Sequence, residues 1–377
     1  MGAATLCVCS IMAATIAQPK RDEQGGQAAG TAHFRVPPGR SGAIRGGSQG
    51  APSRPRRRRV TEAEFIALLR TLPLHCGAAG LRDDAARLGE LVLTTDTIVE
   101  GVHYLAADAP ADVAWKLVAV NLSDLAAKGA TPEGVLLNYP LGEDGWDRAF
   151  LDGLRVALSD LACPLLGGDT VSLPAGAPRV VSLTAIGRAE APPVRGRARA
   201  GDALFVTGTI GDAGAGLAIA RGANGPAALL AAYRRPRPRL VEGRALAPLV
   251  DAMMDVSDGL LIDAARMAEA SGLTATVDLA AVPLSPAYRT FAGEDRAARI
   301  AAATAGDDYE LLFAAPADLA LPVAATRLGA LEAVPSISRH SRVRGDDKGE
   351  LREVSLILTD GGTRVALPES LGFTHRD

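Results

Sequence analysis

Six short acidic segments interrupt an otherwise apolar, Ala-rich chain of 377 residues. They are LRDDAARL (81–88), TTDTIVEGVHY (94–104), NLSDLAAKGA (121–130), LLGGDT (165–170), DVSDGL (255–260) and GDDYELLF (306–313). We interpret aspartates that are so dense, yet so separated in sequence, as walls of one site, so the fold must bring these segments together. Two carboxylates about 4 Å apart repel by about 4 kcal/mol at an effective dielectric of about 20. Divalent metal relieves that repulsion, and Mg²⁺ held by carboxylates usually serves a phosphate substrate. The pattern predicts a metal-dependent enzyme that handles phosphoryl groups.

The size and charge of the chain indicate a globular protein that does not bind nucleic acid. Its length fits two domains, and 48% hydrophobic with 22% charged residues is typical of a globular protein. The net charge of -3 is unevenly spread, because residues 1–59 hold ten basic and two acidic residues and the remainder holds 30 and 41. An acidic body argues against nucleic-acid binding and repels a polyphosphate unless metal ions bridge the two.

Residues 1–59 differ in composition from the rest of the chain. Gly, Pro, Gln and Arg dominate without a hydrophobic period, so we predict a disordered basic extension. Its first 17 residues are apolar, but they lack the preceding basic residues of a signal peptide. The run at 54–59 could touch nucleic acid or a membrane, although a solvated tail is favoured, and a translation start nearer Val60 is a further alternative.

The remaining sequence predicts a cytoplasmic protein. No apolar stretch of 18 residues follows Val60, so no membrane association is expected. The four cysteines have no metal-binding spacing, and structural disulfides are not expected; they are Cys7, Cys9, Cys76 and Cys163.

Hydrophobic periodicity predicts an α+β fold with two mixed domains. Helices are expected at 61–69, 112–128, 145–162, 208–221, 239–250 and 259–271, and strands at 91–95, 133–139, 164–166, 180–186, 202–207, 275–279, 309–314 and 354–358. The alternation is too irregular for a single βαβ winding. A Pro-, Gly- and Arg-rich link at 188–201 predicts domains over 60–190 and 191–377.

Each acidic segment also has an ordinary structural explanation. Its aspartate could cap a helix, occupy an exposed turn, follow a bulge or pair with a nearby lysine; these alternatives concern Asp84, Asp96, Asp124, Asp169 and Asp258. Because the segments lie mostly at strand ends or helix starts, a shared site explains them better together than caps do.

A Gly-rich turn at 208–216 opens one predicted helix. A helix N-terminus offers unpaired N–H groups to a phosphate, but tight packing is the favoured explanation of the glycines. The spacing is neither Gly-x-Gly-x-x-Gly nor that of a P-loop, which disfavours a Rossmann dehydrogenase and a P-loop NTPase. With five histidines and no Gly-x-Ser-x-Gly motif, the chain also lacks signs of covalent catalysis.

Five segments closely resemble thiamine-monophosphate kinase in their order and separation, and the resemblance covers about residues 60–375. The segments are TTDTIVEGVHY, NLSDLAAKGATP, GGDT, DVSDGL and GDDYELLF. That family belongs to the superfamily of aminoimidazole-ribonucleotide synthetase and selenophosphate synthetase. The resemblance implies transfer of the γ-phosphoryl group of ATP to thiamine monophosphate, giving thiamine diphosphate and ADP. It also implies a homodimer, in which N-terminal domains join into a β-barrel and are followed by α/β-sandwich-like C-terminal domains.

The resemblance assigns roles to individual residues. Ligands of several Mg²⁺ ions are expected at Asp84, Thr94, Thr95, Asp96, Asp124, Asp169, Asp255 and Asp258. ATP contacts are expected at Gly168, Asp169, Arg188 and Ser257, and thiamine-phosphate contacts at His103, Asp307 and Phe373. Two departures stand out: Arg82 replaces a usual Gly, and Asp307 takes a place often held by Glu.

The chemistry of this reaction agrees with a site poor in histidine. The second pKa of a phosphate acceptor is near about 6, so it is largely deprotonated at neutral pH and needs no general base. Positioning and cations then carry the catalysis. Two alternatives are another ATP-dependent synthetase of the superfamily and a non-catalytic protein that binds a nucleotide or thiamine phosphate.

Overall fold

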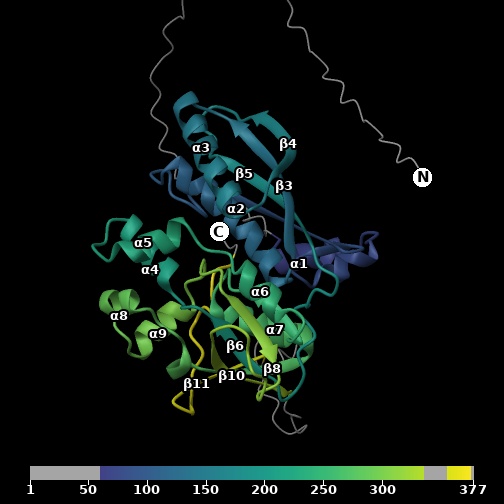
Figure 1. Cartoon of the computed structure of the whole chain (residues 1–377). Helices are drawn as coiled ribbons and strands as arrows, with labels where there is room; N and C mark the ends of the chain where they lie inside the picture. Colours follow the sequence, from purple (N-terminus) through teal and green to yellow (C-terminus); the bar gives the residue numbers. More distant parts are fainter. Residues whose placement is uncertain (1–59, 335–354, 375–377) are drawn as a thin grey trace, which may run out of the picture. The chain divides into compact units, whose positions relative to one another are not determined.

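The computed structural model describes residues 60–334 and 355–374, which lie in one compact unit (Figure 1). The basic extension predicted over residues 1–59 lies outside the described residues. The fold is α+β with two mixed sheets, as predicted. The domain boundary near residue 190 stays a prediction.

The first sheet has five strands in the order β1-β2-β5-β3-β4. Only β3 and β4 pair in parallel. The elements of this half are α1 (Glu62–Leu69), η1 (Cys76–Leu81), β1 (Ala86–Leu88), β2 (Leu91–Val99), α2 (Pro110–Ala127), β3 (Thr131–Leu141), α3 (Asp144–Asp160), β4 (Leu165–Ser172) and β5 (Val180–Arg188).

The second sheet has seven strands in the order β12-β11-β8-β10-β6-β9-β7, and only β8 and β11 pair in parallel. Its elements are β6 (Ala203–Thr207), α4 (Asp212–Ala220), α5 (Ala227–Arg234), α6 (Leu240–Leu246), β7 (Ala252–Asp255), α7 (Leu260–Ser271), β8 (Leu273–Asp278), η2 (Leu279–Ala281), α8 (Pro286–Ala292), α9 (Arg296–Ala303), β9 (Leu311–Ala315), β10 (Ala325–Ala333), β11 (Leu356–Asp360) and β12 (Thr363–Val365).

Helix α2 is the element that joins the two sheets. It contacts β2 and β5 of the first sheet and α6 and β7 of the second, and Figure 1 shows it between them. Being covered on several sides explains why most of its residues are buried and why so many of them are Ala, Val and Leu. The acidic residues Asp112 and Asp124 of this helix are half-buried.

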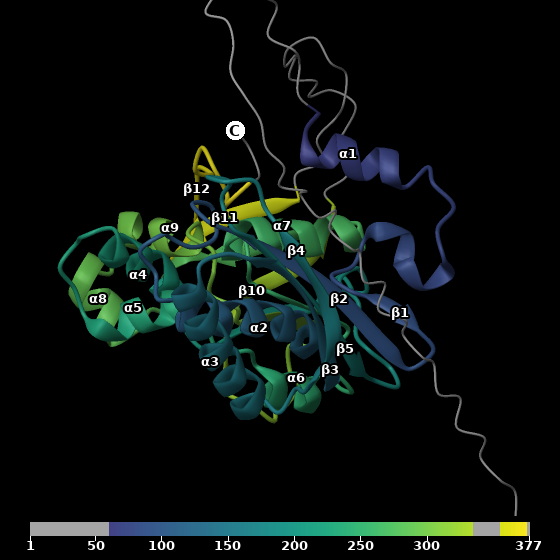
Figure 2. The same ribbon diagram turned by 90° about the horizontal axis from the view of Figure 1, so that it is seen from above.

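One face of the first sheet is covered and the other is open. Helices α2 and α3 pack on the covered face (Figure 2), whereas exposed side chains from several strands line the other. That open face includes Thr95, Thr97, Leu136 and Asn138. A sheet with one uncovered face that carries apolar residues is poised to pack against another surface.

Local details correct some boundaries expected from sequence. The strand expected at 91–95 runs on to Val99, so Asp96 lies inside β2 rather than at its end. The turn before Asp83 takes its left-handed conformation at Ala79, Gly80 and Leu81, while Arg82 has a φ of -119°. Arg in place of the usual Gly therefore causes no backbone strain. Across the described ranges, no helix combines the length and apolarity needed to cross a bilayer.

Candidate active site

A cavity of about 840 Å³ draws its walls from both sheets. Eight of the residues predicted from sequence line it: Asp96, His103, Asp124, Asp255, Ser257, Asp258, Asp307 and Phe373. These residues span almost 280 positions of sequence. The structure thus gathers most of the acidic segments around one hollow.

Strand β2 and helix α2 form one wall of this cavity. Side chains alternate along β2, so Thr94 and Asp96 face α2 while Thr95 faces the open side of the sheet. The Thr94 hydroxyl donates to the Asp124 carboxylate, and the backbone N–H of Asp96 donates to Oδ1 of Asn121 at 3.0 Å. These two bonds fix the relative position of the carboxylates on the strand and on the helix.

Strand β7 and the turn that follows it form the opposite wall. Asp255 ends β7, and its carboxylate accepts a hydrogen bond from Ser123 on α2 at 2.6 Å. The buried carboxylate of Asp263 accepts from the backbone N–H groups of Ser257, Asp258 and Gly259 at 3.1–3.2 Å. Asp263 therefore holds the turn that presents Ser257 and Asp258 to the cavity.

The carboxylates of the two walls repel one another. Burial, followed by the charges of Asp84 and Asp258, raises the pKa of Asp96 to about 6. Burial and neighbouring carboxylates raise the pKa of Asp255 to about 7, and that of Asp124 well above its usual range. At neutral pH the cluster stores an electrostatic cost that a cation would relieve.

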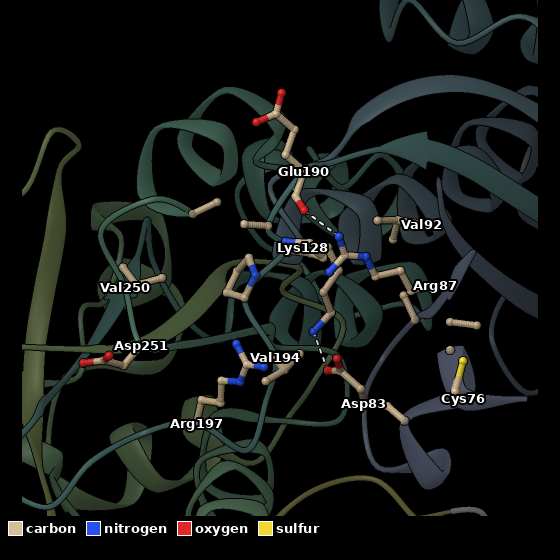
Figure 3. Close-up of a pocket in the computed structure, with 18 of the residues that line it drawn as sticks. Cys76, Asp83, Arg87, Val92, Lys128, Glu190, Val194, Arg197, Val250 and Asp251 are labelled. Carbon is tan, nitrogen blue, oxygen red and sulfur yellow. Dashed lines mark hydrogen bonds and ion pairs between the residues drawn. The ribbon is translucent and has the colours of Figure 1, made fainter. Parts of the chain in front are cut away.

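Asp84 differs from Asp96, Asp124 and Asp255 because its pKa is lowered. Although burial opposes its ionisation, the charges of Lys128 and Arg195 lower the pKa of Asp84 to about 2. Lys128 donates to Asp84 at 2.8 Å and to Asp83 at 2.6 Å, the latter contact drawn in Figure 3, and Arg195 donates to the other oxygen of Asp84. This carboxylate is already neutralised by protein cations.

The residues expected to contact thiamine phosphate line the same cavity, and they are His103, Asp307 and Phe373. Lys116 is buried and donates to the Asp307 carboxylate at 2.7 Å and to the His103 carbonyl at 3.0 Å. Tyr309 donates to the same carboxylate at 3.1 Å. The backbone N–H of Phe373 donates to the Asp258 carbonyl at 2.8 Å, which brings the C-terminal segment to the cavity wall.

Six of the residues predicted from sequence do not line this cavity: Asp84, Thr94, Thr95, Gly168, Asp169 and Arg188. Thr94 bonds the lining residue Asp124, and Asp84 lies beside Thr94. The other four lie apart from the cavity. Thr95 bonds the Leu183 carbonyl at 3.2 Å on the open face. Gly168 and Asp169 lie on the edge strand β4, three strands from β2 and so about 14 Å away at the usual spacing. Arg188 is half exposed and pairs with Glu90 and Glu133.

Several residues at the site were not predicted from sequence. Arg195 and Lys128 contact Asp84, Lys116 bridges two motifs, and Asp263 holds a third. Arg195 lies in the link at 188–201. The sequence shows that this link is rich in arginine, but it does not show which arginine points toward the acidic residues. Lys128 is part of the quoted motif, where an i,i+4 pair with Asp124 was the alternative; its partners are instead Asp83 and Asp84.

The Gly-rich turn is explained by packing. The N–H of Gly211, at the start of α4, donates to both carboxylate oxygens of Asp308 at 2.9 and 3.0 Å. A Cβ on Gly216 would lie 2.0 Å from the Leu229 carbonyl oxygen. An internal carboxylate thus takes the place at this helix end that a phosphate would need.

The carboxylates of the cavity suit a metal ion in kind but do not converge on one as they stand. In the ranges 60–334 and 355–374, no three Asp, Glu, His or Cys side chains converge closely enough to hold an ion as they stand. Asp96, Asp124, Asp255 and Asp258 nevertheless supply the hard oxygen donors that Mg²⁺ prefers, in a cluster that needs positive charge. Asp96, Asp124 and Asp255 fit the ion chemically. Asp258 bonds Arg266 through one oxygen and keeps the other for an ion, whereas both oxygens of Asp84 already bind protein cations.

Comparison with known proteins places the chain in a family. Residues 82–189 match the family described as AIR synthase related protein, N-terminal domain, and residues 199–334 match the corresponding C-terminal domain. A thiamine-monophosphate kinase from Caulobacter vibrioides is 43% identical over 338 residues, which cover 84% of this chain and 91% of the relative. The chain belongs to the thiamine-monophosphate kinase family. The Escherichia coli K12 member is 39% identical over 251 residues, 63% of this chain and 76% of its own length.

Solved structures agree with membership in this family. "AaThiL complexed with AMPPCP and TMP" has a TM-score of 0.69 at 28% identity, covering 84% of this chain and 97% of that one. The thiamine-monophosphate kinase from Stenotrophomonas maltophilia K279a has a TM-score of 0.61 at 32% identity, covering 80% and 96%. The hydrogenase maturation protein HypE in complex with ATP, at 22% identity and a TM-score of 0.58, shares the fold, with coverage of 78% and 90%.

Proposed function

We propose that this protein transfers the γ-phosphoryl group of ATP to thiamine monophosphate, yielding thiamine diphosphate and ADP. The observation that carries the proposal is one cavity lined by carboxylates from both sheets and by the segments around His103 and Asp307, in a chain of this family. AaThiL, which has a similar structure, is complexed with both AMPPCP, an ATP analogue, and TMP, and this supports a site for two phosphate-bearing ligands.

We propose that the reaction proceeds by direct in-line transfer without a general base. The acceptor phosphate is largely deprotonated at neutral pH. Mg²⁺, held by Asp96, Asp124, Asp255 and Asp258, would supply the charge that keeps two anionic phosphates together. The chain itself positions these carboxylates through Thr94, Ser123 and Asp263.

The roles of the basic residues follow from their positions. Arg195 forms an ion pair with Asp84, whereas Arg188 pairs with two glutamates at the surface. Nε of Arg195 is buried without a hydrogen-bond partner in the described part of the chain. We therefore propose Arg195, in place of Arg188, as the arginine that contacts the nucleotide phosphates.

We further propose that the protein is a homodimer whose first sheets close into a barrel. Exposed apolar side chains on and beside β4 support this proposal: Leu136, Leu165, Leu166 and Val171. Thr95 and Asp169 lie on the same uncovered part of the sheet, so their expected contacts with ligand would depend on the second copy. The free thiols of Cys76 and Cys163 support a reducing, cytoplasmic location.

Product analysis by mass tests the proposed function directly. The full chain is incubated with Mg-ATP and thiamine monophosphate, and thiamine diphosphate is expected to appear in equal amount to ADP. Unphosphorylated thiamine serves as the control acceptor and should give no product. ADP release with a different acceptor alone would instead favour another synthetase activity of the superfamily, and binding without any ADP would indicate a non-catalytic protein.

A further inference from the structure

Lysine is rare in this chain, and its placement is selective. The sequence holds only four lysines among 40 basic residues, and the two that lie in the described ranges are both buried. Lys128 follows the C-terminal end of α2 and is 1% exposed. Burying an ammonium group is costly unless its charge and its donors are all matched. The groups that surround the Lys128 ammonium therefore indicate its role.

The Lys128 ammonium is fully matched by three segments of the chain. Nζ donates to Asp83 at 2.6 Å, to Asp84 at 2.8 Å and to the Met253 carbonyl at 3.3 Å, which accounts for all three of its hydrogens. Met253 lies two residues before Asp255 on β7, and Lys128 lies one turn after Asp124. The ammonium thus sits behind the carboxylates of both walls.

Lys128 does not face the cavity that holds the predicted ligand contacts. It lines a different hollow of about 560 Å³, together with Asp83, Arg87 and Val194 (Figure 3). Its contact with the acidic cluster runs through Asp84, whose carbonyl lies 3.5 Å from the Thr94 hydroxyl. The position of Lys128 therefore does not support direct contact with substrate. It supports an electrostatic effect of the ammonium on the nearby carboxylates.

We propose that Lys128 is a resident cation that takes the place of a divalent ion at the Asp83–Asp84 pair. The inference builds on the proposed metal dependence of the cluster, but it concerns ion binding alone. Because Asp84 bonds both Lys128 and Arg195, its charge is satisfied without metal. Without the ammonium, two buried carboxylates would retain one arginine between them, and a divalent ion would restore the balance.

Mg²⁺ binding to the protein without nucleotide tests this proposal. Lys128→Met keeps the length and apolar stem of the side chain but removes its charge. We expect Mg²⁺ to bind the variant about tenfold more tightly than the wild type, a common size for coupling between linked sites. Calorimetry gives the affinity, and the rise in Tm between chelator and Mg²⁺ should be larger for the variant. Equal or weaker Mg²⁺ binding by the variant would overturn the proposal.

Arg234→Met is the control, because it also removes a partly buried cation that faces two carboxylates, Asp108 and Asp112, but contacts neither Asp83 nor Asp84 nor a residue that lines the acidic cavity. It should lower the Tm without tightening Mg²⁺ binding. If Lys128→Met does not fold, Asp83→Asn is compared with the double variant Asp83→Asn/Lys128→Met, in which one charge of each sign is lost. The double variant should bind Mg²⁺ more tightly, and equal affinity would overturn the proposal. Neither outcome depends on turnover of thiamine monophosphate, so failure of the proposed function would be recognised separately.

Discussion

The hydroxyl of Thr94 donates a hydrogen bond to the carboxylate of Asp124, and this contact connects the first sheet to helix α2 at the acidic cluster. The two residues are distant in sequence, because Asp124 follows Thr94 by 30 positions. Burial, followed by the charges of Asp255 and Asp96, raises the pKa of Asp124 well above its usual range. The threonine therefore supplies one of the few favourable contacts available to this carboxylate.

Replacing Thr94 with Val removes that donor while keeping the β-branched shape. A buried polar group left without its partner costs about 1–3 kcal/mol, so we expect kcat/KM to fall roughly tenfold or more. Steady-state kinetics with thiamine monophosphate and Mg-ATP check this result. A variant with wild-type kinetics would show that Asp124 is positioned by other contacts.

Asp255→Asn is expected to abolish activity and yet to stabilise the protein without metal. The pKa of Asp255 is raised to about 7, so above that pH the folded state carries a buried charge that the unfolded chain solvates. As the pH falls below about 7, the folded wild type takes up a proton and this cost disappears. The Tm advantage of the variant in chelator should therefore be largest near pH 8 and shrink towards pH 5.

Calorimetry over this pH range measures that difference. The carboxamide of the variant can still accept the hydrogen bond from Ser123, so the test isolates the charge. An advantage that grew as the pH fell would contradict the assignment of a raised pKa.

Arg195→Met and Arg188→Met separate the two arginines of the basic link. Arg188 is half exposed, and surface ion pairs such as its pairs with Glu90 and Glu133 contribute only about 0–1 kcal/mol. We expect the Arg188 variant to retain nearly normal kinetics. Arg195→Met should raise the KM for ATP, because it removes the guanidinium that bonds Asp84 and that we propose contacts the nucleotide phosphates. A larger effect from Arg188 would restore the role predicted from sequence.

Lys116→Met should affect the acceptor more than the nucleotide. The ammonium holds Asp307 and the His103 carbonyl together, and it lies 4.3 Å from the centre of the Tyr233 ring. We expect the KM for thiamine monophosphate to rise roughly tenfold, equivalent to about 1.4 kcal/mol of lost binding. The KM for ATP should change less, and an equal rise in both would indicate a general structural defect.

Hydrophobic periodicity predicts helix α2 but not the ion pairs that its residues form. Spacing along 112–128 predicted a helix that carries Asn121, Asp124 and Lys128, and the helix spans Pro110–Ala127. The pattern could not reveal that Lys128 pairs with Asp83, because this partner comes from a turn 45 residues earlier. Strand and helix formation depend on local pattern, whereas ion pairs inside the core depend on tertiary packing.

Loops and glycines were harder to interpret. The link at 188–201 contains several arginines, and only the fold distinguishes the half-buried Arg195 from the exposed Arg188. The sequence of the glycines at 208–216 allows two explanations, and the contact of the Asp308 carboxylate with the start of α4 favours packing. The strand alternation of β2 explains why Thr94 and Thr95, adjacent in sequence, lie on opposite faces.

The exposed edge of the first sheet provides a test of the proposed dimer. Leu166 on β4 is 55% exposed, and an apolar side chain on an uncovered sheet edge is a typical subunit contact. Leu166→Glu should convert the dimer to a monomer, seen by light scattering coupled to gel filtration. Leu151→Glu, on α3 at 50% exposure, is the control and should stay dimeric. If the Leu166 variant remains dimeric, the subunits associate through another surface. The proposal that a second copy brings ligand to Asp169 and Thr95 would then be contradicted.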